Sequence, residues 1–379
     1  MTGADDGTQD PGVVDGESRR AGDASSEGNG HGAGDSTGGG NHAAGETAGG
    51  DNHAAGVTAG GDNHAAGVTA GGGNPFADVT EADIRERFAA ADYVADDELV
   101  TTVYLALTLG KPLLIEGEPG SGKTELGKVL AQGFDTDLVR LQCYEGLAAE
   151  NTLYEWNYTK QLLAVQSGEG SVAAGDSVFD DEYLLERPLL RALRDTGDTP
   201  PVLLIDEVDR ADEAFEAFLL EVLSDFQVSI PEYGTVAASQ PPVVVITSNR
   251  TRALSDALKR RCLYLHVEPP SFETEVEIVR RKVPELDPVV AAEVCSIVQE
   301  LRESSFLKRP GVAETLDWAR AVAALRADDG DEPISAAEIE RTVGALLKEA
   351  EDHARLDADL LERLETAARE ARAAAAGED

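Results

Sequence analysis

Few of the residues that build disulfide-linked or zinc-stabilised proteins occur in this 379-residue chain. It has three cysteines, Cys143, Cys262 and Cys295, which stand far apart in apolar surroundings and without metal-ligand spacing. This pattern argues against a cysteine metal site. We expect three buried free thiols in the reducing environment of a cytoplasm.

Long hydrophobic runs are also absent. No stretch of about 18 apolar residues appears, and the N-terminal region is polar and glycine-rich, without the apolar core of a secretory signal. We therefore expect no membrane insertion and a cytoplasmic location.

Basic residues are scarce relative to acids. Lys and Arg total 32 against 72 Asp and Glu, which gives a net charge of -40, and the first 73 residues carry only 11 of the acids. The acidity therefore belongs mainly to the remaining chain. Such a surface repels nucleic-acid phosphates and anionic membranes, so a general nucleic-acid-binding role is disfavoured. A comparable excess of acids is typical of proteins from salt-accumulating halophiles.

Residues 1–73 contain almost no large apolar side chain and cannot bury enough surface to offset the entropy of ordering, which predicts a disordered tail. A repeat of 11 residues places His42, His53 and His64 in near-identical settings. Regularly spaced histidines could hold a metal ion weakly. No Cys or second His stands beside any of them, however, so a solvated linker is favoured.

The remaining chain predicts two domains, residues 74–269 and 270–379. In the first, short apolar runs alternate with helical stretches, which indicates a five-stranded parallel sheet flanked by helices, an α/β fold. These runs are 112–116, 138–143, 201–205, 242–247 and 262–267. The second domain has a helical pattern throughout. It is broken near Arg309-Pro310-Gly311 and ends in an alanine-rich helical stretch from Ala336 to Ala376.

The strongest motif follows the first predicted strand and opens a predicted helix, the context that G-x-x-x-x-G-K-[ST] requires. It reads Gly117-Glu118-Pro119-Gly120-Ser121-Gly122-Lys123-Thr124. Glycines let successive backbone N–H groups turn inward and hold phosphate oxygens. We expect Lys123 to reach the β- and γ-phosphates of ATP, Thr124 to ligate Mg²⁺, and Glu125 to lie beside them. A chance glycine-rich turn is the alternative.

A second motif ends the strand Val202-Leu203-Leu204-Ile205 with two acids, Asp206 and Glu207. A core strand tolerates such an ending only where it meets solvent or a cation. It reads as a Walker B motif, in which Asp206 holds Mg²⁺, generally through water, and Glu207 orients and deprotonates the attacking water. An exposed acidic turn is the alternative.

Two further candidates follow in order. Asn249 ends the apolar strand beginning at Val243 and is predicted to act as sensor 1, positioning the lytic water, unless it is an ordinary turn residue. The basic cluster Lys259-Arg260-Arg261 precedes the fifth strand. In so acidic a chain such a cluster indicates an anionic partner. The γ-phosphate bound by a neighbouring subunit would be such a partner, if one of these arginines acts as an arginine finger. Arg261 is favoured, with Arg260 as the other choice.

This order of motifs, followed by an all-helical region, resembles AAA+ ATPases with an α-helical lid. Two segments resemble the MoxR family in particular, and the likeness covers about residues 76–325. LAAENTLYEWNYTKQLLAVQ is similar to its helix-2 insert. FQVSIPEYGTVAASQPP alternates like a hairpin around Pro231-Glu232-Tyr233-Gly234 and is similar to the family's pre-sensor-1 hairpin. The segments LQCYEG, YEWNY and RPGVAETLDWA resemble the CoxD-like branch. The lid departs from the AAA+ pattern, because the helix after Gly311 has no sensor 2 arginine at the expected place. Arg309 stands just before that helix and is the candidate to bind the nucleotide in its place.

The resemblance implies a hexameric ring that uses ATP and Mg²⁺ in chaperone-like remodelling. Its partner would be a protein with a von Willebrand factor A domain, and its client an enzyme complex such as a carbon monoxide dehydrogenase-type molybdenum enzyme. The acidic composition indicates a halophilic archaeon as the source. Two alternatives remain open, a nucleic-acid motor or clamp loader and a nucleotide-dependent regulatory switch.

Overall fold

The computed structural model describes residues 74–167, 179–195, 197–326 and 332–377. The predicted disordered tail, residues 1–73, lies outside these ranges together with its three repeated histidines. Its predicted disorder therefore stays a prediction.

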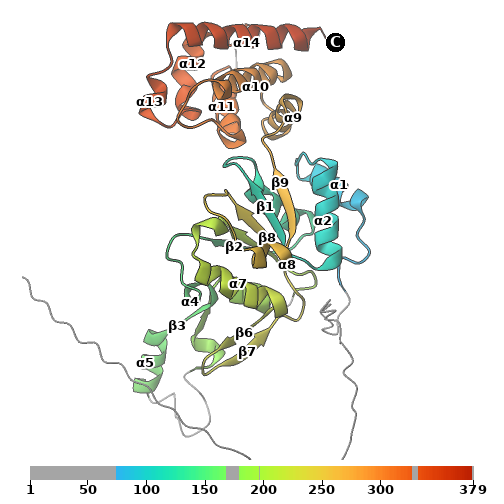
Figure 1. The fold of residues 1–379 in the computed structure, drawn as a ribbon, viewed down its shortest axis with the longest axis vertical. Coiled ribbons are helices and arrows are strands. Elements are labelled where there is room, and N and C mark those ends of the chain that lie inside the picture. The colour runs from blue at the N-terminus through green and yellow to red at the C-terminus, as the bar shows by residue number, and fades with distance from the viewer. Residues whose placement is uncertain (1–73, 168–178, 196, 327–331, 378–379) are drawn as a thin grey trace, which may run out of the picture. The chain divides into compact units, whose positions relative to one another are not determined.

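Five strands form one parallel sheet in the order β2-β5-β8-β1-β9 (Figure 1). They are β1 (Leu113–Gly117), β2 (Leu138–Gln142), β5 (Val202–Asp206), β8 (Val243–Ser248) and β9 (Leu263–Val267). Each strand matches a predicted apolar run to within one residue at either end, so the predicted five-stranded α/β fold is confirmed. In a parallel sheet the carboxyl ends of all strands meet at one edge. The glycine-rich loop, the Asp206-Glu207 pair and Asn249 all follow strands at that edge.

Successive strand residues bury opposite faces of the sheet, as the period of two requires. Leu203 and Ile205 belong to one apolar cluster, whereas Leu204 belongs to another. Helices cover both faces, so the strands read as continuous apolar runs. The helices that pack with Leu204 are α1 (Glu81–Ala90), α2 (Asp97–Leu109) and α3 (Lys123–Gly133). Those that pack with Leu203 and Ile205 are α6 (Pro188–Arg194) and α7 (Glu213–Asp225).

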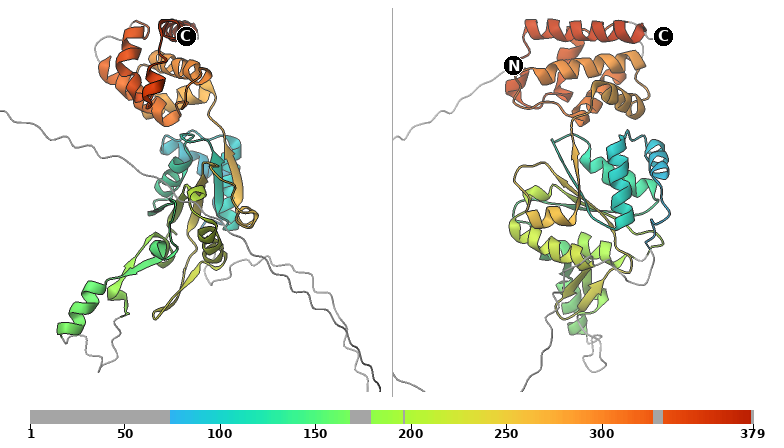
Figure 2. Two further views of the ribbon diagram at one scale, coloured as in Figure 1. Left: turned by 60° about the vertical axis from the view of Figure 1, so that its left-hand side comes forward. Right: turned by 45° about the vertical axis from the view of Figure 1, so that its right-hand side comes forward.

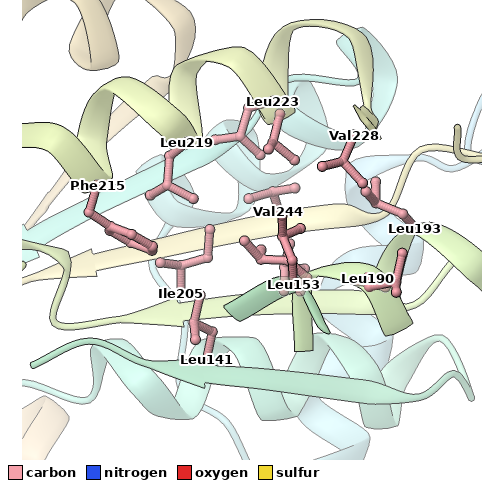
Figure 3. Packing of buried hydrophobic residues seen from close by; sticks show 14 of the residues in the cluster. Leu141, Leu153, Leu190, Leu193, Ile205, Phe215, Leu219, Leu223, Val228 and Val244 are labelled. Atoms are coloured by element: carbon pink, nitrogen blue, oxygen red, sulfur yellow. The ribbon is translucent and has the colours of Figure 1, made fainter. Parts of the chain in front are cut away.

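Figure 3 shows the packing on the α7 face of the sheet. Phe215, Leu219 and Leu223 project from α7 toward Ile205 and Val244 of the strands. These three positions recur every four residues, so they lie on one side of the helix. That stripe fixes α7 over β5 and β8, whose ends carry the Asp206-Glu207 pair and Asn249.

Local signals set the ends of the first two helices. The Thr80 hydroxyl accepts the N–H of Asp83, whose carboxylate accepts the N–H of Thr80 in return, which completes a capping box before α1. Asp96 caps α2 through a single bond, which its side chain accepts from the N–H of Leu99. Gly110 ends α2 with φ of 60°, a left-handed conformation that favours glycine.

Two additions extend from the sheet domain (Figure 2). The first has α4 (Glu150–Leu153), β3 (Tyr154–Trp156), α5 (Tyr158–Ser167), η1 (Asp181–Tyr183) and β4 (Leu184–Glu186), and its two strands pair antiparallel. The second is an antiparallel hairpin of β6 (Gln227–Ile230) and β7 (Gly234–Ala237). This hairpin confirms the one predicted around Pro231–Gly234. Two short helices complete the domain, η2 (Val208–Arg210) and α8 (Asp256–Arg261).

The C-terminal region is helical, as predicted, and has its own apolar cluster around the fully buried Trp318. Its elements are α9 (Phe272–Lys282), α10 (Pro288–Glu303), α11 (Val312–Leu325), α12 (Ala336–Thr342), η3 (Val343–Ala345), α13 (Ala350–His353) and α14 (Ala358–Ala376). The stretch predicted from Ala336 to Ala376 is thus divided into several helices. Asp357 caps a new helix start there through the N–H of Leu360.

The three cysteines lie inside the protein. Cys143, Cys262 and Cys295 are all buried and free, as predicted. Burial raises the pKa of Cys143 and of Cys262 to about 12, so both stay protonated at neutral pH. No helix within the described ranges has the length and apolarity needed to cross a bilayer.

Candidate functional site

The glycine-rich loop joins β1 to α3 with a backbone that other residues would disrupt. Gly120 and Gly122 have φ of 81° and 88°, in the left-handed region. A Cβ added at Gly117 would lie 2.3 Å from the carbonyl oxygen of Val267, because β9 passes directly beside it. The loop therefore needs its glycines for two reasons, backbone conformation and close approach.

Lys123 begins α3 and folds its side chain back over the loop. It is only 6% exposed, and its ammonium group donates to the carbonyl oxygens of Gly117 at 3.0 Å and Glu118 at 2.6 Å. Burial lowers the pKa of Lys123, although Asp209 and Asp206 act in the opposite direction. A phosphate group placed in the loop would offer this ammonium anionic acceptors in place of neutral carbonyls.

Asp206 ends β5, and its side chain is only 3% exposed. Oδ1 accepts from the Thr124 hydroxyl at 2.9 Å and from the Thr247 hydroxyl at 2.5 Å. Oδ2 accepts from the Arg140 guanidinium, with Nη2 at 2.6 Å and Nε at 3.2 Å. The two predicted Mg²⁺ ligands, Thr124 and Asp206, thus come into contact although 82 residues separate them.

This oxygen pair fits a magnesium ion. Mg²⁺ prefers oxygen ligands. Here the hydroxyl of Thr124 and Oδ1 of Asp206 lie side by side, joined by a hydrogen bond of 2.9 Å. Within the described residues no group of three or more His, Cys, Asp or Glu side chains forms a metal cluster. A few protein oxygens completed by phosphates and water is the usual arrangement for Mg²⁺.

Glu207 has a strained backbone. Its φ and ψ are 55° and 49°, a left-handed conformation that costs a non-glycine residue about 1–3 kcal/mol. Its N–H donates to the Thr247 hydroxyl at 2.9 Å, and its carboxylate lies 3.1 Å from Nη1 of Arg210. The bond from its N–H restrains the backbone of the second Walker B acid at the end of β5.

Asn249 follows β8, the strand between β5 and β1, so it lies between the Asp206-Glu207 pair and the glycine-rich loop in the order of the sheet. Its N–H donates to the buried carboxylate of Asp209 at 3.1 Å, which also accepts from the N–H and the hydroxyl of Thr251. Burial alone would raise the pKa of Asp209, but the bonds from Thr251 and Asn249 hold it below its usual value. Asp209 therefore stays ionised and fixes the turn that carries Asn249.

The predicted finger residues lie in the last turn of α8. Arg261 donates from Nε to the Ser224 hydroxyl at 3.1 Å, and Arg260 is exposed. Lys259 lies 3.8 Å from the buried carboxylate of Glu116, which immediately precedes the glycine-rich loop. No hydrogen bond or ion pair of the described residues joins Arg260 or Arg261 to that loop or to Asp206.

The remaining predicted residues lie where the helical region meets the loop. Glu125, in the first turn of α3, pairs with Lys128 at 3.0 Å and lies 3.7 Å from Lys282 of α9. Arg309 is exposed and borders a pocket beside the glycine-rich loop. Other residues that line this pocket are Glu118, Pro119, Gly120, Ser121, Arg302 and Gly311.

The backbone at Gly311 lies directly against the backbone of the glycine-rich loop. The N–H of Val312, the first residue of α11, donates to the carbonyl oxygen of Gly120 at 3.2 Å. A Cβ added at Gly311 would lie 3.0 Å from the Cα of Gly120 and 3.3 Å from the carbonyl oxygen of Pro119. Both of these atoms are backbone and cannot move aside easily.

We therefore expect Gly311→Ala to lower the free energy of unfolding by about 1–3 kcal/mol through overpacking, measured by urea denaturation. Gly344→Ala is the matched control, because its added Cβ would meet only the His353 ring at 3.9 Å. Equal stability of the two variants would show that the contact between Gly311 and Gly120 is loose in solution.

Three site residues were missed from the sequence. Arg140 lies in a strand, LVRLQC, that looked wholly structural. Thr247 lies inside an apolar run, and Asp209 lies two residues beyond the Walker B pair. The one available signal was polarity, because a hydroxyl in VVVIT and a third acid in DEVD each need a buried partner.

Comparison with known proteins finds similarity over part of the chain. Residues 112–262 match the family model of the AAA domain (dynein-related subfamily). An uncharacterized protein of Staphylococcus haemolyticus is 24% identical over 238 residues, 61% of this chain and 82% of that protein. The gas vesicle ATPase GvpN of Haloferax mediterranei is 25% identical over 208 residues, 52% of this chain and 58% of that protein. Among solved structures, the Thermotoga maritima RuvB Holliday junction branch migration motor aligns with a TM-score of 0.40 at 18% identity, covering 68% of this chain and 69% of that chain.

Proposed function

We propose, from the premise that this chain carries an AAA+ ATPase domain, that it hydrolyses ATP with Mg²⁺ and uses the energy to remodel a partner protein. One observation carries the hydrolytic part. The Thr124 hydroxyl lies 2.9 Å from the Asp206 carboxylate, and Glu207 follows Asp206 with its carboxylate 33% exposed. The glycine-rich loop, these two oxygens and Glu207 lie at one edge of the sheet, which supports the proposal that they act together.

Each residue has a defined task in this proposal. Lys123 and the loop N–H groups bind the β- and γ-phosphates, and Thr124 with Asp206 holds Mg²⁺, which neutralises phosphate charge when it is bound. Glu207 accepts a proton from the attacking water. Asn249 orients that water, and Arg261 of a neighbouring subunit, or else Arg260, stabilises the charge on the transferred phosphoryl group. Arg309 borders the pocket beside the loop and contacts the nucleotide in place of a sensor 2 arginine.

We further propose that the chain is a MoxR-type ATPase of the CoxD-like branch, from a halophilic archaeon, and that it works in the cytoplasm as a homo-hexameric ring. The β6–β7 hairpin before β8 and the additional elements α4, β3 and α5 support the MoxR placement. The net charge of -40 supports the halophilic source and argues against a nucleic-acid motor. A protein with a von Willebrand factor A domain and a client metalloenzyme complex are the proposed partners.

Purified chain should hydrolyse ATP in the presence of Mg²⁺, and removal of the ion with EDTA should abolish phosphate release, as measured by a coupled assay. ATP should also convert the protein to a hexamer-sized species in light scattering at molar salt. No turnover above the background without protein would contradict the proposed function. Strong stimulation of turnover by DNA rather than by protein would instead favour a nucleic-acid motor.

A further inference from the structure

Thr247 places a single hydroxyl between the two Walker B acids. It lies in the central strand β8, and its residue is 1% exposed. Its hydroxyl donates to Oδ1 of Asp206 at 2.5 Å and accepts the N–H of Glu207 at 2.9 Å. A threonine hydroxyl has one proton to donate and lone pairs to accept, so both bonds form at the same time.

This hydroxyl is buried inside the sheet domain. Val245 lies two positions earlier in β8, on the same face of the sheet as Thr247, and is fully buried. A hydroxyl in such a place costs free energy unless it is hydrogen-bonded. Here every bond that the described structure gives it goes to Asp206 or to the backbone of Glu207.

The two acids depend on this contact in different ways. For Asp206, the bond fixes Oδ1, the same oxygen that contacts the Thr124 hydroxyl. For Glu207, the bond restrains the N–H of a residue whose left-handed backbone is unfavourable without support from its neighbours. The metal-binding oxygen and the base are therefore set by one side chain.

Arg140 cannot take over this task. Its guanidinium contacts Oδ2 of Asp206, but its side chain is 49% exposed, and ion pairs at such sites are screened by salt. It also makes no hydrogen bond or ion pair with Glu207 in the part of the chain that the structure describes. Thr247 is buried and bonds to both acids.

We propose that Thr247 is a positioning residue that orients Asp206 toward the metal ion and holds Glu207 in its left-handed conformation. This inference rests on the proposed ATP hydrolysis and adds to it a third residue on which both acids depend. Loss of the hydroxyl should weaken metal use and turnover together, while binding of the nucleotide itself persists.

The test compares three variants. Thr247→Val removes the hydroxyl and keeps the shape, and Thr247→Ser keeps the hydroxyl. Thr152→Val is the matched control, because Thr152 of α4 is also fully buried but bonds to the carbonyl oxygen of Ala149, the residue before that helix. The measurements are kcat, KM for ATP, the Mg²⁺ concentration at half-maximal turnover, and fluorescent ADP binding with and without Mg²⁺.

For Thr247→Val we expect kcat to fall and the half-maximal Mg²⁺ concentration to rise, each by about 10–100-fold, the usual cost of losing a group that orients a metal ligand. Binding of ADP without Mg²⁺ should match the wild type. Thr247→Ser should restore both quantities, and Thr152→Val should leave them unchanged.

Wild-type kcat and Mg²⁺ dependence in Thr247→Val would overturn the inference. Equal loss in Thr247→Ser would do so too, because the hydroxyl would then not be the group that matters. If the wild type itself does not hydrolyse ATP, the proposed function fails. In that case the increase in ADP affinity on adding Mg²⁺ still tests the inference. An increase that is lost in Thr247→Val and kept in Thr247→Ser supports the role of the hydroxyl. An equal increase in both variants overturns it.

Discussion

Glu207→Gln should bind ATP as tightly as the wild type and lose about 10²–10⁴-fold in kcat, the usual contribution of a positioned general base. Glutamine has the same shape as glutamate, and its N–H can still donate to the Thr247 hydroxyl. Its side-chain oxygen can also still accept from Arg210. What it cannot do is take a proton from water. The loss should therefore appear in phosphate release and not in nucleotide titrations.

Glu221→Gln is the matched control for this variant, because Glu221 is an exposed acid on α7 and makes the same change of charge away from the site. Unchanged turnover in Glu207→Gln would remove Glu207 from the mechanism. The same variant should hold ATP without releasing it as products, so affinity capture with it should retain the partner protein longest.

The sheet and the glycine-rich loop could be predicted because their signals are local. A strand buried on both faces is a short apolar run, as in Leu113–Gly117. In the loop, glycines stand at 120 and 122, the positions where the backbone adopts a positive φ. The hairpin at Pro231–Gly234 was also local, because alternating residues flank a turn.

Contacts across the sheet could not be predicted in the same way. Arg140 is 66 residues from Asp206 in sequence, and Thr247 is 41 residues away. They meet Asp206 only because β2 and β8 flank β5, and strand order is a tertiary property. The division of residues 336–376 was missed for another reason. Alanine and charged residues favour helix throughout, and the break depends on Asp357 capping a new helix.

Arg261→Ala should retain ATP binding and lose about 10³–10⁵-fold in kcat, the range for removal of an arginine finger. Arg261 and Arg260 end α8 and make no hydrogen bond or ion pair with the glycine-rich loop or Asp206 among the described residues. A role in turnover therefore requires the loop of another subunit. Arg260→Ala is the control with the same loss of charge, and we expect it to have the smaller effect.

Mixing two inactive variants separates a finger in a neighbouring subunit from a local structural role. An Arg261→Ala subunit still has Glu207, and a Glu207→Gln subunit still has Arg261, so their shared interface regains one complete site. Mixed rings should therefore recover part of the wild-type turnover, whereas each variant alone stays inactive. Recovery with Arg260→Ala instead of Arg261→Ala would identify Arg260 as the arginine finger. No recovery in either mixture would show that neither arginine acts across a subunit interface.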